Sequence, residues 1–388
     1  MLDFKKLTAV AGGVLLLSAL AGPLHAVTLQ HLFEADVDVF GQTDDERRKA
    51  FAAALWDVLV KVTGDRSVPS RPEVQTLFRR AERLVQQYQY REIEAPVADA
   101  VSGPGEQVES LSFDIGVDVN VDAGTATSAP THVLWIQFAP ETVERHLSRL
   151  GIPLWGKERP ETLVWLAVED GRQRYLLGAG SDSDVHRELL SVAQQRGVPL
   201  LFPVMDVADR TSVRFSDVRG NFVQPVWDAS RRYGVDSILA GNLTRTLGGE
   251  WQAQWTLHRR GNTSSWRVQS GDRTAGLLSG VEGVASVLSR ELAVGYYGAG
   301  SGRTLLTIHE VDAIADYSQV LIYLRGLSLV KEVMVERVNE GRLTVALQLR
   351  GDPEDLQRTI ALGDTLIAVR DVAGGDNPHR VLQYAYLP

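Results

Sequence analysis

The chain has 388 residues, no cysteine and a formal net charge of −9. At roughly 100–200 residues per domain the length predicts about two to four domains, and 44% hydrophobic with 23% charged residues is ordinary globular composition. The missing cysteines exclude disulfides, zinc–thiolate sites, iron–sulfur clusters and cysteine nucleophiles, and the negative charge provides no basic field for nucleic acid.

Residues 1–26 have the three parts of a secretory signal peptide. Lys5 and Lys6 form a charged start, residues 7–20 form an apolar run, and Ala26 offers a small residue at the cleavage position. The run is shorter than the roughly 20 residues that span a bilayer, so cleavage is favoured over a retained membrane anchor. We therefore expect a periplasmic protein without a transmembrane segment after cleavage, with the retained anchor as the alternative.

Residues 27–155 are typical of an α+β domain. Alternating apolar residues predict half-buried strands, and Thr43 with Glu46 forms a capping box that opens a helix. Gly64 ends that helix, and Pro72 suits the first turn of a second one. In chain order we expect a strand at 29–39, helices at 43–64 and 72–88, a loop at 95–107, strands at 111–121 and 133–138, and a helix at 141–150.

Residues 156–297 predict an α/β domain. The apolar run at 163–168 has no polar interruption, as expected of a central strand that is buried on both faces. Gly197 and Gly234 each end a helix. The predicted strands lie at 163–168, 174–178, 198–204, 238–243, 251–258 and 265–268, and the predicted helices lie at 184–196, 224–233 and 277–294.

Residues 298–302 form a glycine-rich linker by composition, and residues 303–388 predict a third domain. Its element order is β-α-β-β-α-β, which is the ferredoxin-like motif. Strands are expected at 304–310, 330–338, 342–350 and 365–370, helices at 314–325 and 353–362, and a last strand at 381–386 on an edge of the sheet. The whole chain therefore predicts a multi-domain fold of the α+β and α/β classes, with small mixed sheets that carry helices on one or both faces.

The sequence has no motif of the common serine-hydrolase, zinc-protease or nucleotide-binding types, so we expect neither an enzyme nor a cofactor. Its histidines are isolated, with none four residues from another, and this spacing predicts no metal site. An alternative for His186 is a serine triad with the nearby Ser181 and Asp182.

Two pairs of acidic residues follow predicted strands of the middle domain. Glu169 and Asp170 come after the first buried strand, and Asp206 and Asp209 come after the next. Ligands of open α/β sheets lie beyond the carboxyl ends of the strands, so parallel strands would bring the four carboxylates to one rim. That rim would serve a cation, a sugar or general acid–base chemistry, whereas the simpler interpretation is that acidic residues favour turns.

Tryptophans of the middle domain give a second set of candidates. Trp251 and Trp255 share one face of a predicted strand, and Trp266 lies on the following strand. Aromatic platforms bind sugars, but Ala253 and Leu257 share the same face, which favours core packing under the closing helix. The candidate ligand-binding residues are therefore the four carboxylates together with Trp251 and Trp255.

Distinctive segments are spread over the first two predicted domains. They are Arg159–Val168 (RPETLVWLAV), Arg196–Asp206 (RGVPLLFPVMD), Ala229–Gly241 (ASRRYGVDSILAG), Leu59–Gly64, Arg71–Glu73 and Leu154–Trp155. They resemble an exported bacterial family, domain of unknown function 2066, over about residues 27–297. The resemblance implies a Gram-negative envelope protein and assigns no catalytic residue.

The order strand, helix, strand in the middle domain is followed by Tyr233-Gly234, Asp236 and Gly241 before an antiparallel pair. This arrangement is similar to small periplasmic α/β modules of curli-secretion lipoproteins, penicillin-binding-protein activators and the N-terminal part of the Tol translocation protein. In such modules these residues end a helix, begin a strand and allow close sheet packing. The similarity is one of fold, and it implies binding to other envelope proteins.

The sequence as a whole predicts a non-enzymatic periplasmic protein that binds envelope proteins. The alternative is a glycan- or peptidoglycan-binding protein, or a hydrolase, that uses the strand-end carboxylates with an aromatic wall. Neither hypothesis needs a metal or a cofactor.

Overall fold

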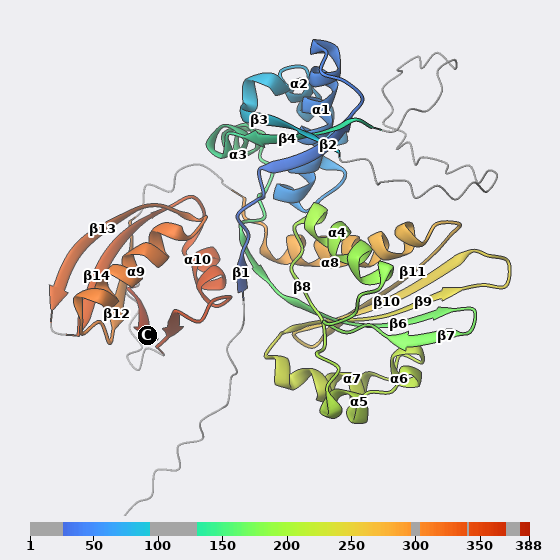
Figure 1. Cartoon of the computed structure of the whole chain (residues 1–388). Helices are drawn as coiled ribbons and strands as arrows, with labels where there is room; N and C mark the ends of the chain where they lie inside the picture. The colour runs from blue at the N-terminus through green and yellow to red at the C-terminus, as the bar shows by residue number, and fades with distance from the viewer. Residues whose placement is uncertain (1–25, 94–129, 296–302, 340, 370–380) are drawn as a thin grey trace, which may run out of the picture.

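The computed structural model describes residues 26–93, 130–295, 303–339, 341–369 and 381–388 (Figure 1). These residues form helices and several small mixed sheets, so the predicted fold class is confirmed. The predicted signal up to residue 25, the loop at 95–107, the strand at 111–121 and the linker at 298–302 lie outside the described residues. Among the described helices, none combines the length and the apolar character that a bilayer crossing requires.

The N-terminal part is a three-stranded antiparallel sheet covered by helices. Its strands lie in the order β2 (Glu34–Val39), β4 (His132–Phe138) and β3 (Val85–Glu92), and its helices are α1 (Asp44–Thr63), α2 (Pro72–Phe78) and α3 (Pro140–Arg149). Helix α1 begins at the predicted Thr43–Glu46 capping box and ends at Gly64, whose φ of 70° is left-handed. A short strand β1 (Ala26–Thr28) pairs with β5 (Glu158–Pro160), which ties the start of the chain to the middle part.

Two predictions for this part are wrong in their boundaries. The helix expected at 72–88 ends at Phe78, and the chain passes through a 3-10 turn, Ala81–Leu84, into β3. Apolar residues of this segment fit both a helical and an alternating pattern, and pairing with β4 satisfies the backbone. The strand expected at 29–39 begins at Glu34, because the Leu29 amide bonds Lys157 instead of the sheet.

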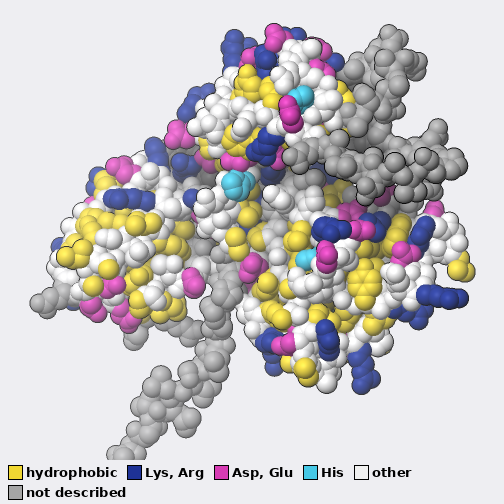
Figure 2. All heavy atoms as spheres, in the orientation of Figure 1, with side chains coloured by type: hydrophobic (Ala, Val, Ile, Leu, Met, Phe, Trp, Pro, Cys, Tyr) yellow, Lys and Arg dark blue, Asp and Glu magenta, His cyan; other side chains and the backbone are white. Residues whose placement is uncertain are grey.

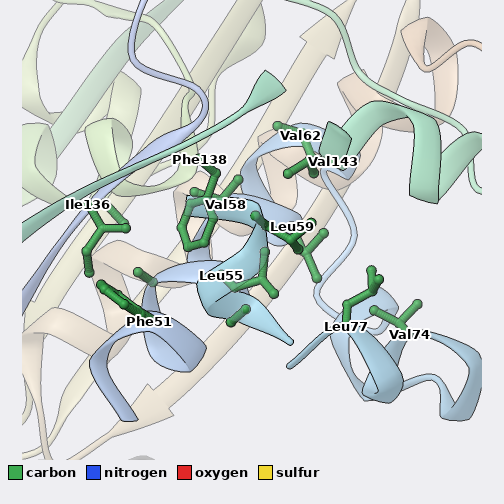
Figure 3. Close-up of a cluster of buried hydrophobic side chains, with 14 of the residues drawn as sticks. Phe51, Leu55, Val58, Leu59, Val62, Val74, Leu77, Ile136, Phe138 and Val143 are labelled. Carbon is green, nitrogen blue, oxygen red and sulfur yellow. The ribbon is translucent and has the colours of Figure 1, made fainter. Parts of the chain in front are cut away.

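The N-terminal core is built around one face of α1. Phe51, Leu55, Val58, Leu59 and Val62 follow helical spacing on this face, and each is at most 2% exposed. Figure 3 shows these side chains gathered with residues of α2, β4 and α3. The partners drawn there are Val74, Leu77, Ile136, Phe138 and Val143.

The middle part is a six-stranded mixed sheet with helices on both faces. Its strands lie in the order β11 (Asn262–Ser270), β10 (Trp251–Arg259), β9 (Ser237–Arg245), β6 (Thr162–Asp170) and β7 (Gln173–Leu176), with β8 (Leu200–Leu201) beside β6. Figure 1 shows α4 (Asp184–Arg196) and α8 (Arg273–Leu292) on one face, and α5 (Val207–Ser212), α6 (Phe215–Arg219) and α7 (Val223–Ser230) on the other. Helices on both faces explain why β6 is buried at nearly every position.

The strand predicted at 198–204 is reduced to the two residues of β8. Pro199 and Pro203 flank it, and proline has no N–H to donate to a ladder. Met205 then adopts a left-handed backbone with a φ of 57°, which turns the chain into α5. The sequence did not predict helices α5 and α6. Each is shorter than two helical turns, so no helical spacing of apolar residues can be recognised in it.

The C-terminal part has the predicted β-α-β-β-α-β order followed by one more strand. Its elements are β12 (Arg303–His309), α9 (Ile314–Gly326), β13 (Val330–Asn339), β14 (Arg342–Leu349), α10 (Pro353–Ile360), β15 (Leu366–Ala368) and β16 (Leu382–Tyr386), and the sheet order is β13-β14-β12-β16-β15. The last strand was expected at an edge, but it lies inside the sheet, parallel to β12. Leu382, Tyr384 and Tyr386 are all buried, whereas β15 buries only Leu366, so the more apolar strand takes the inner position.

Candidate functional site

The first predicted acidic pair is neutralised by arginines. Glu169, at the end of β6, accepts hydrogen bonds from Nε of Arg174 at 2.7 Å and Nε of Arg219 at 2.8 Å. The hydrogen bond from Arg219 is the main reason that the pKa of Glu169 lies below its usual value. Asp170 lies 3.6 Å from Nη1 of Arg245 in β9. Glu169 and Asp170 together therefore link β6 to β7, α6 and β9.

The second pair fixes the turn before α5. Asp206 is the N-cap of α5, and its carboxylate accepts hydrogen bonds from Nη1 and Nη2 of Arg232 at 2.9 and 2.8 Å. Asp209 is 1% exposed and accepts from the Met205 amide at 2.9 Å and from the Tyr233 hydroxyl at 2.5 Å. Burial, together with the bond to Asp209, raises the pKa of Tyr233 to about 12. This cluster holds the left-handed turn at Met205 in place.

The two acidic pairs are held by separate sets of arginines. Strands β6 and β8 are parallel, as the hypothesis required, but β8 pairs only with the first two residues of β6. The Glu169 pair and the Asp206 pair bind different arginines, and no group of three or more histidine or acidic side chains in the described ranges is placed to hold a metal. The glycan hypothesis for these residues stays a prediction.

Asp206 gives the first testable prediction. Hydrogen bonds from Arg232 lower the pKa of Asp206 to about 2. The stability that the ionised Asp206 contributes is therefore complete above about pH 4, near the pKa of an unfolded aspartate, and is lost as the pH falls to about 2. Asp206→Asn keeps a good N-cap and removes the charge. We expect the variant to melt below the unmodified protein at neutral pH and the difference to shrink between about pH 4 and about pH 2. Thermal unfolding followed by circular dichroism over this range measures it, and a pH-independent difference would contradict the assignment.

The other candidates are structural as well. Trp255 is fully buried, and its Nε1 donates to the Gly276 carbonyl and to Oγ of Ser279, both at 3.1 Å. Trp251 is 8% exposed, on the same face under α8. The core interpretation of both tryptophans therefore describes their positions better than an exposed platform does.

The alternative triad does not form. Nδ1 of His186 hydrogen-bonds the backbone carbonyl of Ser181 at 2.7 Å rather than a carboxylate. Asp182 pairs instead with Arg187 at 2.9 Å. The Ser181 hydroxyl donates to Ser183, the N-cap of α4, so these side chains organise the start of a helix.

A different site lies where the three parts of the chain meet. We call it the junction groove: a depression of about 530 Å³ between the loop after β1, the start of α3, the segment 154–157 and the end of α9. Its apolar lining includes Leu29, Leu32, Phe33, Leu154, Leu327 and Val330. Its charged lining consists of Glu141, Glu144, Lys157, Arg325 and Arg350. Hydrophobic walls with a few charged groups are typical of a binding site.

The charges of the groove are only partly paired. Glu144 of α3 lies 2.5 Å from Nη1 of Arg350, which joins the N-terminal and C-terminal parts across the groove. Burial raises the pKa of Glu144, and Arg350 opposes that rise. Lys157, Arg325 and Glu141 have no ion pair with any residue in the described ranges, although Lys157 is close enough to Glu144 to help lower its pKa. The unpaired charges of the groove are therefore two cations and one carboxylate, which leaves a net positive charge for a ligand. Figure 2 shows that charges of both signs are interspersed over the visible face of the molecule.

Ser328 fixes the C-terminal wall. Its amide donates to Oε1 of Glu158 at 3.1 Å, its hydroxyl donates to the other oxygen of that carboxylate, and the Lys157 amide donates to the hydroxyl at 3.3 Å. These bonds join the loop after α9 to β5. The wall of the groove therefore rests on a small number of polar contacts.

Arg159 supports the groove from below. It is fully buried, and its guanidinium lies 3.7 Å from the ring centre of Trp155. It donates to five backbone carbonyls: those of Gly156 at 3.0 Å, Gly197 at 2.5 Å, Lys61 at 2.7 Å, Trp155 at 3.1 Å and Arg196 at 3.5 Å. Burial, together with Arg196, lowers the pKa of this guanidinium. Arg159 therefore connects the ends of α1 and α4 to the segment that lines the groove.

Sequence reasoning missed the groove and its support. The groove residues are distant in the sequence, and no motif links Leu29, Lys157 and Arg325. Arg159 and Arg196 do have a signal, because each lies within four residues of a predicted apolar strand and inside a distinctive segment. An arginine beside an apolar run indicates a buried guanidinium that donates to backbone carbonyls at the ends of neighbouring helices and strands.

Comparisons with known proteins give little on function. None of the curated proteins matches the chain. One solved structure, described as "Crystal structure of uncharacterized protein", is 10% identical, with a TM-score of 0.15, over 34% of this chain and 99% of that chain. That similarity is too low to place the two proteins in one fold.

A family model does match the N-terminal part. The resemblance to domain of unknown function 2066 is wrong, because the matching family is a different one and its model covers a shorter range. The matched range contains the whole N-terminal core from Leu32 to Leu154 and ends in the lining of the junction groove. Residues 26–156 match the family described as "Domain of unknown function (DUF8605)".

Proposed function

We propose that this chain is an exported, non-enzymatic envelope protein that binds a partner protein in the junction groove. The observation that carries the proposal is the combination of an apolar lining with two unpaired cations, Lys157 and Arg325. The export signal at residues 1–26 supports a location outside the cytoplasm.

The chemistry of the groove favours one kind of ligand. Leu29, Phe33 and Leu327 would remove apolar side chains of a partner from water, which is the main source of affinity in such surfaces. Lys157 and Arg325 would pair with acidic side chains at the rim and select among partners. An apolar protein segment that carries carboxylates therefore fits the groove better than a neutral sugar.

Photo-crosslinking in intact cells tests the proposal. A photoreactive amino acid at position 325 lies in the groove, whereas the same group at position 172 lies in the exposed turn between β6 and β7. We expect a discrete adduct of higher mass from position 325 and none from position 172. The N-terminal peptide of this chain in the adduct is expected to begin at residue 27, which tests signal cleavage in the same experiment. Equal adducts from both positions, or none from position 325, would exclude the groove as the binding surface.

A further inference from the structure

Strand β11 is an open edge of the middle sheet. It ends the sheet order, and in the part of the chain that the structure describes no strand pairs with its outer side. Its nine residues pair with β10 without a register shift. Every second N–H and C=O of such a strand points away from its neighbour, so β11 presents a regular ladder of free backbone groups.

The other edges of the described sheets are protected. Strands β7 and β15 are short, with four and three residues, and β3 and β13 contain register shifts. Strand β2 places Glu34, Asp36 and Asp38 along its six residues. Strand β11 has no proline, no bulge and a single charged residue, Arg267. Proteins usually guard long edges against pairing, so an unguarded one indicates a use for it.

A groove follows this edge on the α8 side. Trp266 and Val268 lie opposite Trp255 and Ala253 of β10, and therefore on the face that α8 covers. With α8 and the end of α1 they line a groove of about 720 Å³, which we call the α8 groove. Nε1 of Trp266 donates to the Ser279 carbonyl at 2.9 Å, which fixes the indole against the helix.

Small residues of α8 keep the α8 groove open. Ala275, Ser279, Gly283 and Ser286 line it at helical spacing. A β-carbon at Gly283 would lie 2.0 Å from the Trp266 ring, so glycine alone allows the indole to lie against the helix. A strand added to β11 would direct alternate side chains into this space.

The lining of the α8 groove contains two arginines, Arg66 and Arg290, and two carboxylates, Asp65 and Glu282. Glu282 is shared by Arg66 at 3.1 Å and Arg196 at 2.7 Å, so one carboxylate faces two guanidiniums. Arg290 has no acidic partner among the described residues, since its Nε donates to the Ser286 carbonyl. Asp65, the other acid of the lining, is paired with Arg71. Both carboxylates of the lining are therefore paired with arginines, and Arg290 is the cation of the lining that an acidic ligand would balance.

We infer that β11 accepts an extended acidic segment of another protein as an added strand, with its alternate apolar side chains in the α8 groove. Backbone hydrogen bonds to the edge supply affinity, and the groove with Arg290 supplies specificity. A second copy of this chain is disfavoured, because each copy carries a net charge of −9 and presents the same arginines to the other. The inference adds a second binding surface to the proposed function and does not depend on the junction groove.

Selection of random short peptides, displayed on phage, for binding to the whole mature chain tests this inference. We expect the selected peptides to have apolar residues at alternate positions and an acidic residue, and to protect the amides of residues 262–270 from hydrogen exchange. Ser286→Trp fills the α8 groove without altering β11, and we expect it to weaken binding by more than about tenfold. Arg290→Glu is expected to weaken binding by about threefold, as for a rim charge, and to favour lysine-containing peptides instead.

Arg172→Glu, on the opposite side of the sheet, is the matched charge control and should leave peptide binding unchanged. Circular dichroism of each variant confirms that the fold is retained. Three results would overturn the inference: peptides without the alternating acidic pattern, binding that Ser286→Trp leaves intact, or a concentration-dependent dimer of the chain that Ser286→Trp abolishes. None of these results bears on crosslinking from position 325, so the two proposals fail separately.

Discussion

Replacing Arg159 with alanine is expected to lower the free energy of unfolding by about 3–5 kcal/mol. The guanidinium is fully buried and donates to five backbone carbonyls, and the alanine variant would remove this donor from all of them. Each unsatisfied buried acceptor costs about 1–3 kcal/mol, and partial entry of water keeps the total below the simple sum. The N-terminal and middle parts would also lose their link through Lys61 and Gly197.

Chemical denaturation followed by tryptophan fluorescence measures this loss. Arg172→Ala is the matched control, because Arg172 is exposed in a turn, and surface substitutions of this kind usually stay within about 0.5 kcal/mol. Arg159→Lys keeps the charge, but one ammonium group has three N–H donors and cannot bond all five carbonyls, so we expect its stability to lie between those of the two alanine variants. An Arg159→Ala midpoint equal to that of Arg172→Ala would show that the buried network does not support the fold.

Replacing Trp255 with alanine is expected to destabilise the middle part by about 3–5 kcal/mol. The indole lies between β9 and α8, where β-carbons at Gly241 and Gly280 would come within 2.2 and 2.6 Å of it. Alanine would leave a cavity between these glycines and remove two hydrogen bonds from Nε1. We therefore expect Trp255→Ala to lower the stability of the protein. If Trp255 were instead part of an aromatic platform for sugars, the variant would stay folded and lose its ligand.

Trp227→Ala provides the control for this experiment. Trp227 lies on α7 and is 36% exposed, so its removal should cost clearly less than that of the fully buried Trp255. Thermal unfolding of the two variants measures the contrast between a buried and an exposed indole. A Trp255→Ala variant as stable as Trp227→Ala would revive the interpretation of Trp255 as a ligand-binding residue.

Local patterns predicted most of the secondary structure. The apolar run of β6, the capping box at Thr43 and the left-handed Gly64 are each determined by neighbouring residues, and the structure contains all three. The segment at 72–88 was mispredicted, because its apolar residues fit two periods and only pairing with β4 decides between them. The inner position of β16 depends on competition with β15 for burial, which no local pattern records.

The candidate site could not be predicted in the same way. The sequence showed that Glu169 and Asp206 follow strands, but not that Arg219 and Arg232 would neutralise them from other elements. The junction groove combines Leu29, Lys157 and Arg325, which tertiary packing alone brings together. Charge pairing and groove formation are both long-range events, so they appear only when the parts of the chain are assembled.

The central claim is that a partner protein binds in the junction groove, and the charge dependence of crosslinking tests it most directly. The measurement compares the adduct formed from position 325 in the unmodified background with that formed in a Lys157→Glu background. Lys157 has no ion pair with the described residues, but it lies near Glu144, so circular dichroism must first show that the Lys157→Glu variant keeps its fold. In a folded variant the reversed charge should repel an acidic segment. We predict that Lys157→Glu reduces the yield of the adduct several-fold. An adduct whose mass and yield are unchanged by the reversal would contradict the account.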